Sequence, residues 1–264
     1  KRVQVLKNNG VQLDGFSCVM EGHREQPTVY VNHYFREDVT KEDLCTLAAM
    51  VLKIQRDSML HQTGDFEMLL DYEKMKKRIY CRLISRNKNE ELLKTVPWIP
   101  WMDLAIVFYM EIPGKLIKNA TALIRTAHME RWKITEDQLF ERAKKNLQRR
   151  GFRMVAMTEF LGDQVECPDA EMYILNTKKP EFGAAVFVDS QVRRICARQI
   201  GGSYYILPSS IHEVLLLPVM DEMSAWDLRQ IVGTMNHQVV SDEEVLSDHV
   251  YRYLHKCNKL IIAA

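Results

Sequence analysis

Residues 203–218 read SYYILPSSIHEVLLLP, in which two short apolar runs flank a polar stretch. The runs 204–207 and 214–217 have the length of buried β-strands, and the proline and serines between them favour a turn. We therefore predict two strands joined by a turn. This turn also holds the most concentrated chemistry in the chain, in the side chains of Ser209, Ser210, His212 and Glu213.

The order strand, strand, helix occurs three times in the second half of the sequence. In chain order the units are 104–112, 120–126 and a helix over 135–149; then 172–175, 184–188 and a helix over 189–200; then 204–207, 214–217 and a helix from Ser224. The helix start at Thr135 is the clearest, because Thr135 and Gln138 have the spacing of a capping box. A closing hairpin is expected over 250–253 and 260–262. Strands paired through short turns and covered by helices predict an α+β fold with an antiparallel or mixed sheet.

The N-terminal part is predicted to be a hairpin followed by a mainly helical lobe. Asn9-Gly10 between the apolar runs 3–6 and 11–13 favours a tight hairpin turn, because both residues tolerate positive φ. A strand is expected over 27–31 and a helix from Thr40. The Lys-, Arg- and Glu-rich stretch 65–96 then predicts two or three amphipathic helices.

The segment Pro97-Trp98-Ile99-Pro100-Trp101 interrupts these patterns, because each proline removes a backbone donor. We place a boundary there, between an N-terminal lobe at 1–97 and an α+β sheet domain at 98–264. One continuous domain is the alternative.

Composition excludes several classes of protein. The 264 residues are 47% hydrophobic with a formal net charge of +1, so the whole chain lacks the basic field of a nucleic-acid-binding protein. The chain has a local basic cluster, which we interpret as a solvated helix face in preference to a binding site for a polyanion, so nucleic acid is disfavoured as a partner. The cluster consists of Lys74, Lys76, Lys77, Arg78, Arg82 and Arg86. No apolar run reaches the roughly 20 residues of a membrane-spanning helix, so no membrane is expected as a partner.

The six cysteines form no C-x-x-C pair, which favours free thiols in a reducing compartment and a soluble, cytoplasmic protein. The sequence begins at Lys1 and not at methionine, so we expect the numbering to start inside a longer chain.

Ser210, His212 and Glu213 suggest a hydrolase in which histidine activates serine and a carboxylate orients the ring. The spacing opposes this interpretation, because Ser210 and His212 would share one face of a strand while Glu213 points to the other. A turn in which Ser209, Ser210 and His212 satisfy one another is therefore favoured. A catalytic alternative needs a remote carboxylate, and the C-terminal stretch is the best donor, with Asp242, Glu243 and Asp248 beside His249.

Metal and cofactor sites have no support in the sequence. No second histidine follows His212-Glu213 at helical spacing, and Gly201-Gly202 lacks the third glycine of a nucleotide-binding loop. The acidic stretch 241–249 lacks the alternating ligands and glycine of a calcium loop, and is expected to begin a helix and carry a second cap. We predict no cofactor.

Several motifs resemble those of an uncharacterised bacterial family that is classed only as a domain of unknown function. They are KNNGV at 7–11, PTVYV at 27–31, DLAIVFYM at 103–110, LPSSIHEVLLLP at 207–218 and EEVLSDHVYRY at 243–253. The resemblance covers the chain from Lys7 to Tyr253, and it implies no activity, cofactor or substrate.

We therefore expect a non-enzymatic binding module, with a protein as one option for its partner. The alternative is a hydrolase or transferase that uses Ser210 and His212 with a remote carboxylate. The sequence leaves open whether the protein is an enzyme.

Overall fold

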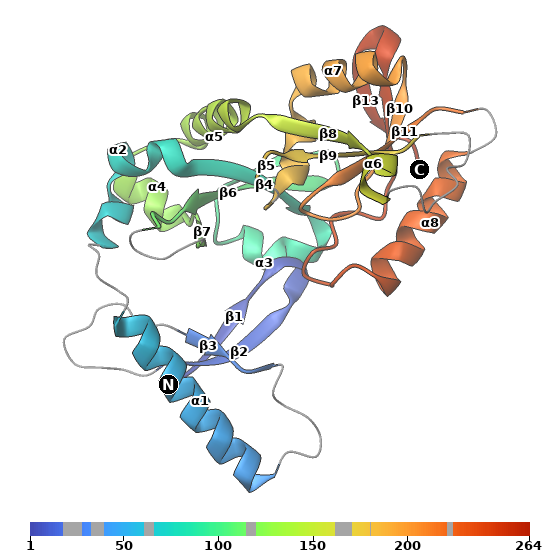
Figure 1. The fold of residues 1–264 in the computed structure, drawn as a ribbon. Helices are drawn as coiled ribbons and strands as arrows, with labels where there is room; N and C mark the ends of the chain where they lie inside the picture. Colours follow the sequence, from blue (N-terminus) through green and yellow to red (C-terminus); the bar gives the residue numbers. More distant parts are fainter. Residues whose placement is uncertain are drawn as a thin grey trace.

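Figure 1 shows the computed structural model, which describes residues 1–17, 28–32, 40–60, 66–114, 120–161, 171–179, 181–220 and 224–264. Its strands form three antiparallel sheets. The N-terminal sheet has the order β1-β2-β3, the central sheet β4-β6-β5 with β7 beside β6, and the C-terminal sheet β13-β12-β10-β11-β9-β8. With the helices between them, these sheets confirm the α+β fold class.

The C-terminal sheet contains the strands on either side of the predicted turn. Its strands are β8 (Phe152–Ala156), β9 (Tyr173–Thr177), β10 (Tyr204–Leu207), β11 (Val214–Pro218), β12 (Tyr251–Leu254) and β13 (Lys259–Ile262). β10 and β11 pair antiparallel with Ile206 opposite Leu216, and both side chains are fully buried. The closing hairpin is also confirmed, with Asn258 in the left-handed region at its turn.

The longer helices of this half begin where their caps predict. α5 (Glu136–Arg150) starts with Thr135 Oγ1 accepting from the Gln138 amide at 3.3 Å, while Gln138 Oε1 accepts from the Thr135 amide at 3.0 Å. α7 (Ser190–Ile200) and α8 (Ala225–Gln238) follow Asp189 and Ser224, whose side chains accept from backbone amides of the first turn. The shorter helices α4 (Thr126–Trp132) and α6 (Met157–Leu161) were not predicted.

The central sheet corrects the helical prediction for residues 65–96. Short helices flank a strand in this stretch: η3 (Phe66–Leu70), α2 (Tyr72–Met75) and η4 (Lys76–Arg78) precede β4 (Ile79–Ser85), and η5 (Asn87–Asn89) and α3 (Glu90–Leu93) follow it. β4 alternates buried Ile79, Cys81 and Leu83 with partly exposed Tyr80 and Arg82, a strand period hidden by the charged composition around it.

β4 pairs along its whole length with β6 (Leu104–Glu111), which also pairs with β5 (Trp98–Trp101) and β7 (Thr121–Leu123). The central sheet thus contains strands from both sides of the boundary predicted at residues 97 and 98.

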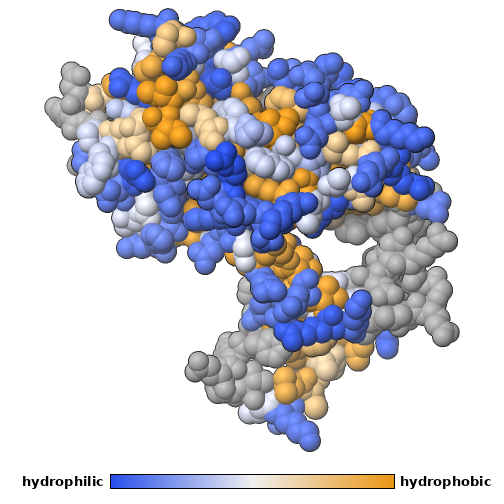
Figure 2. Space-filling model, turned by 180° about the vertical axis from the view of Figure 1, so that it is seen from behind, coloured by the Kyte–Doolittle hydropathy of each residue, from blue (hydrophilic) through white to orange (hydrophobic). Residues whose placement is uncertain are grey.

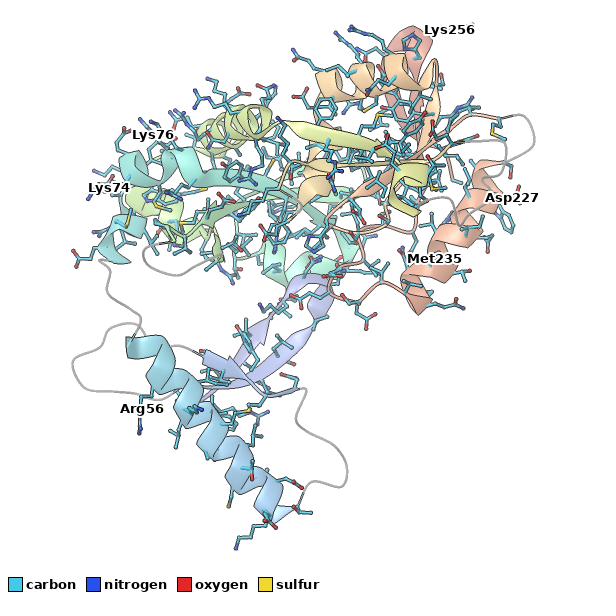
Figure 3. The ribbon with its side chains drawn as sticks, in the orientation of Figure 1. Arg56, Lys74, Lys76, Asp227, Met235 and Lys256 are labelled. Carbon is cyan, nitrogen blue, oxygen red and sulfur yellow. The ribbon has the colours of Figure 1, made fainter. Side chains whose placement is uncertain are left out.

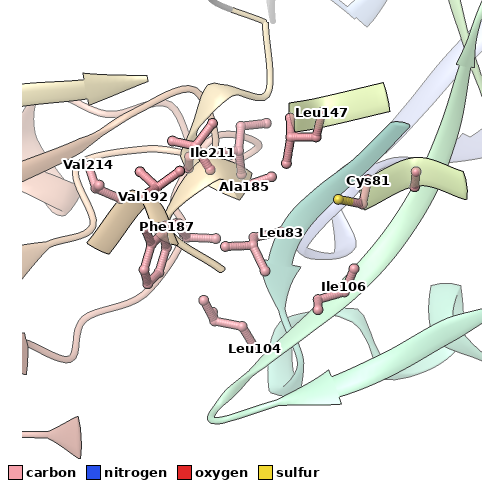
Figure 4. Close-up of a cluster of buried hydrophobic side chains, with 14 of the residues drawn as sticks. Cys81, Leu83, Leu104, Ile106, Leu147, Ala185, Phe187, Val192, Ile211 and Val214 are labelled. Atoms are coloured by element: carbon pink, nitrogen blue, oxygen red, sulfur yellow. The ribbon is translucent and has the colours of Figure 1, made fainter. Parts of the chain in front are cut away.

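The prediction of a strand over 184–188 is wrong, because this segment is a 3-10 helix, η7 (Gly183–Val188). Phe182, at φ 57°, turns the chain immediately before it. Figure 4 shows Ala185 and Phe187 of η7 packed beside Leu83 of β4 and Ile211. A segment enclosed on all sides is continuously apolar whether it is a strand or a helical turn, so its sequence does not separate the two.

The core lies between the central and C-terminal sheets, with η7 between them (Figure 4). Helices cover the outer faces. Leu92 and Leu93 of α3 pack against Val107 of the central sheet, whereas Leu228 and Val232 of α8 pack against the C-terminal sheet.

The N-terminal sheet and α1 extend away from this body (Figure 1). The strands are β1 (Arg2–Leu6), β2 (Gln12–Ser17) and β3 (Thr28–Tyr30), and the helix α1 (Lys41–Leu60) begins after Thr40 as predicted. The β1–β2 hairpin is confirmed, with Asn9 at φ 57° and Gly10 at φ 74°. The hairpin turn touches the body, because Asn8 Nδ2 donates to the Glu243 carbonyl and Asn9 Nδ2 to the Asp242 and Val245 carbonyls.

The residues of the predicted basic cluster do not share one helix face. Lys74 and Lys76 lie at the outer edge of the body (Figure 3), and each forms an ion pair with the carboxylate three residues before it. Arg82 instead lies on β4.

Seen from behind, hydrophilic side chains cover most of the surface of the body (Figure 2). Hydrophobic residues gather at the upper left of this view and where the N-terminal sheet meets the body. None of the helices within the described ranges is long and apolar enough to span a membrane.

Candidate functional site

The serines of the His212 turn (residues 208–213) are held by the turn's own backbone. Ser209 Oγ donates to the Glu213 carbonyl at 3.2 Å, and the Ser210 amide donates to the same carbonyl at 3.3 Å. Ser210 Oγ accepts the amide of His212 at 3.0 Å. These bonds close a six-residue connection between β10 and β11.

The imidazole of His212 has a partner at each nitrogen. Nδ1 accepts the backbone amide of Phe182 at 3.2 Å, and Nε2 lies 3.4 Å from Glu244 Oε1. An acceptor Nδ1 places the proton of the neutral ring on Nε2, facing the carboxylate. The ring also stacks on Phe182, with centroids 5.6 Å apart and planes at 15°. With the side chains of His212 32% and Glu244 46% exposed, this pair is accessible from solvent.

A remote carboxylate therefore does approach His212, but it is Glu244 and not one of the residues named from the sequence. The Ile211 amide donates to the Glu244 carbonyl at 2.9 Å, which fixes the two segments side by side. Among the predicted donors, Asp248 accepts from Asn236, and His249 pairs with Asp103. The helix expected at 241–249 is wrong: residues 242–244 form a turn, in which the carbonyls of Asp242 and Glu243 accept from the N-terminal hairpin and that of Glu244 accepts from Ile211 instead of from a following helical turn.

Asp103 gathers a polar cluster that the sequence did not reveal. Its Oδ2 accepts from Ser247 Oγ at 2.7 Å and lies 3.0 Å from His249 Nδ1, while its Oδ1 accepts from Tyr251 OH at 2.7 Å. Burial, and then the charge of Asp103, raise the pKa of Tyr251, which keeps its hydroxyl as a donor. The cluster ties the segment that carries Glu244 to the turn between β5 and β6.

Phe182 and Gly183 bring η7 against the His212 turn. Phe182 occupies the left-handed region, which is costly for a residue with a large side chain. A Cβ added at Gly183 would lie 2.5 Å from the His212 carbonyl oxygen and 2.9 Å from the Thr177 amide nitrogen. Only glycine fits this approach.

β4 brings Arg82 next to Phe182. Its guanidinium carbon lies 4.8 Å from the centroid of the Phe182 ring. The Nε atom is buried without a hydrogen-bond partner. Burial lowers the pKa of Arg82 to about 10, and the charge of Glu243 partly opposes that shift. We call Arg82, Phe182, His212 and Glu244 the His212 cluster.

A network of charged side chains lies beside the His212 cluster. Glu111 accepts from Arg150 at 2.8 Å and from Lys179 at 2.7 Å, and Arg150 also donates to the hydroxyl of Tyr109. Tyr109 meets Phe182 edge to face, with centroids 4.9 Å apart. Arg150 is thus paired with a carboxylate and a hydroxyl, in contrast to Arg82.

We also considered a cavity away from the His212 cluster and groups of side chains that could bind a metal ion. A cavity of about 220 Å³ between α5 and α7 is lined by side chains that include Leu147, Phe152 and Val192, and it contains no residue of the His212 cluster. Within the described ranges, no three histidine, cysteine, aspartate or glutamate side chains are grouped so that they could hold a metal ion.

The sequence model of DUF5688, a family of unknown function, matches residues 1–255. The chain therefore belongs to this family. No curated protein and no solved structure matches the chain.

Proposed function

We propose that this member of the DUF5688 family is a cytoplasmic, non-enzymatic binding module, and that its ligand contacts the His212 cluster. The family supplies no activity to carry over, so the proposal depends on the geometry of the cluster.

One observation carries the proposal: both nitrogens of His212 are engaged, and neither faces a serine hydroxyl. Nδ1 accepts from Phe182 and Nε2 faces Glu244. A histidine that activates a serine must present an unprotonated nitrogen to the hydroxyl. Ser210 Oγ instead accepts a backbone amide. The arrangement supports recognition more than nucleophilic catalysis.

The cluster has the composition of a recognition site. It places an aromatic ring, an imidazole, a carboxylate and a guanidinium together, and two of these side chains are about a third or more exposed. Convergent polar groups beside an apolar ring fix the orientation of a bound molecule. The free buried thiols of Cys81 and Cys196 support a reducing, cytoplasmic setting.

The test is a thermal-shift screen with organic acids, amino acids, nucleotides and sugars. We expect a compound that raises the melting temperature of the wild type and of His255→Ala, but not of His212→Ala. His255 is the control because it is an exposed histidine on the distant closing hairpin. A hit that His212→Ala retains in full would contradict the proposal.

The second candidate is a hydrolase or transferase that uses Ser210 and His212, with Ser209 and Glu213 shaping the turn. The carboxylate of Glu244 beside the imidazole favours it, because such a pair orients a catalytic histidine. Hydrolysis of nitrophenyl esters or phosphates by the wild type, lost in Ser210→Ala, would establish this candidate in place of the binding module.

A further inference from the structure

The side chain of Arg82 is the one charged group of the His212 cluster that lacks a partner. Within the described ranges it forms neither a hydrogen bond nor an ion pair, and its guanidinium lies over the face of the Phe182 ring. The charge of Glu243 acts on it, but the two side chains form no ion pair. A guanidinium carries five N–H donors, so its bonding capacity is unused.

We infer that Arg82 binds the carboxylate group of a small ligand, which completes the His212 cluster. This inference rests on the proposal that the cluster binds a ligand, and it adds the chemical class of that ligand. A partly buried guanidinium without an anion is costly, and a carboxylate that approaches it can form two parallel N–H···O bonds.

Arg193 shows what a structural arginine looks like in the same protein. Its Nε is also buried without a partner, and its side chain is partly buried like that of Arg82. However, its terminal NH1 donates to the carbonyls of Phe187 and Val188, at 2.5 and 2.8 Å. The Arg193 side chain therefore connects α7 to η7 by hydrogen bonds, whereas the Arg82 side chain forms no hydrogen bond to any described segment.

The charges around Arg82 favour a carboxylate over a phosphate. One guanidinium balances one negative charge, and the nearby charges of Glu243 and Arg125 act on Arg82 in opposite directions, so together they do not balance an additional one. The phosphate dianion would bring that additional charge into a partly buried site. The Phe182 ring beside the guanidinium fits a carboxylate attached to a flat apolar group.

The first experiment needs no ligand. We compare urea unfolding of the wild type, Arg82→Met and the matched control Arg193→Met. Because methionine removes an unpaired, partly buried charge, the midpoint of Arg82→Met should equal or exceed that of the wild type. Arg193→Met should lower the midpoint, because it leaves two carbonyls without their donor. A similar decrease in both variants would make Arg82 structural and overturn the inference.

The second experiment measures binding of sodium benzoate by thermal shift and calorimetry, at constant ionic strength set with sodium chloride. Benzoate should raise the melting temperature of the wild type and of Arg193→Met, and its affinity for Arg82→Met should be at least about tenfold lower. Benzamide, which has the same shape without the charge, should not bind. No effect of benzoate, an effect that Arg82→Met retains, or tighter binding of inorganic phosphate would each overturn the inference.

The imidazole signal of His212, assigned by comparison with His212→Asn, separates this inference from the proposed function. If benzoate shifts that signal equally in the wild type and in Arg82→Met, the cluster binds a ligand but Arg82 does not anchor it. If benzoate binds through Arg82 without shifting the signal, the anion site stands and the proposed role of His212 fails.

Discussion

Replacing Asp103 by alanine tests whether the segment that carries Glu244 is held by this one carboxylate. Asp103 is only 18% exposed, and it accepts from Ser247 and Tyr251 at 2.7 Å. His249, whose Nδ1 lies 3.0 Å away, is 37% exposed. The substitution removes an acceptor shared by three residues of the segment.

The magnitude follows from the two buried donors. A hydrogen bond to a charged group contributes about 1.5–3 kcal/mol, and a buried donor left unpaired costs a similar amount. Tyr251 is fully buried and Ser247 nearly so, whereas water can replace the partner of His249. Relief of the desolvation of Asp103 offsets part of the loss. We expect Asp103→Ala to lower the free energy of unfolding by about 3 kcal/mol.

Urea unfolding measures the loss, with Asp103→Asn and Asp242→Ala as comparisons. Asparagine keeps one acceptor oxygen for Tyr251, so it should cost about half as much. Asp242 lies on the same segment with an exposed side chain, so Asp242→Ala should change stability by less than about 0.5 kcal/mol. A loss below about 1 kcal/mol in Asp103→Ala would refute the reasoning, since the cluster would then not anchor the segment.

Three further outcomes are expected. Thr135→Ala should lower the free energy of unfolding by about 1 kcal/mol, because it removes half of the capping box with Gln138; an unchanged urea midpoint would contradict this. Gly183→Ala should cost about 1–3 kcal/mol and shift the imidazole signal of His212, because its Cβ would clash with that residue's carbonyl; wild-type stability and spectrum would show that the clash is absent. Burial lowers the pKa of His128 below its usual 6.5, so the unfolded chain binds the proton more readily and wild-type stability should fall as the pH drops below 6.5. His128→Asn should flatten that dependence, and an identical pH profile would assign it to other groups.

The sequence predicted elements whose stability is local. The capping boxes at Thr135 and Ser224 and the Asn9-Gly10 turn each satisfy backbone groups within a few residues, so their pattern can be read in one window. The strands β10 and β11 were predicted for a related reason, because a short apolar run between turn residues fits a buried strand.

Long-range contacts explain where the prediction was wrong. β4 is a strand because β6 pairs with it, although the charged residues around it suggest a helix. Residues 183–188 form a 3-10 helix because both sheets enclose them, and the apolar run alone fits either structure. In each case, contacts from outside the window decided the conformation.

For the candidate site, the sequence by itself determined that Ser209, Ser210, His212 and Glu213 share a turn, because the strands on either side bring them there. Only the tertiary structure decided what His212 faces. Its partners come from residues 182 and 244, and Arg82 joins the cluster from a strand 130 positions earlier in the chain (212 minus 82). The physical reason is that hydrogen bonds and charge pairs act over a few ångströms in space, whereas the spacing of residues in a sequence reports distance only within one element.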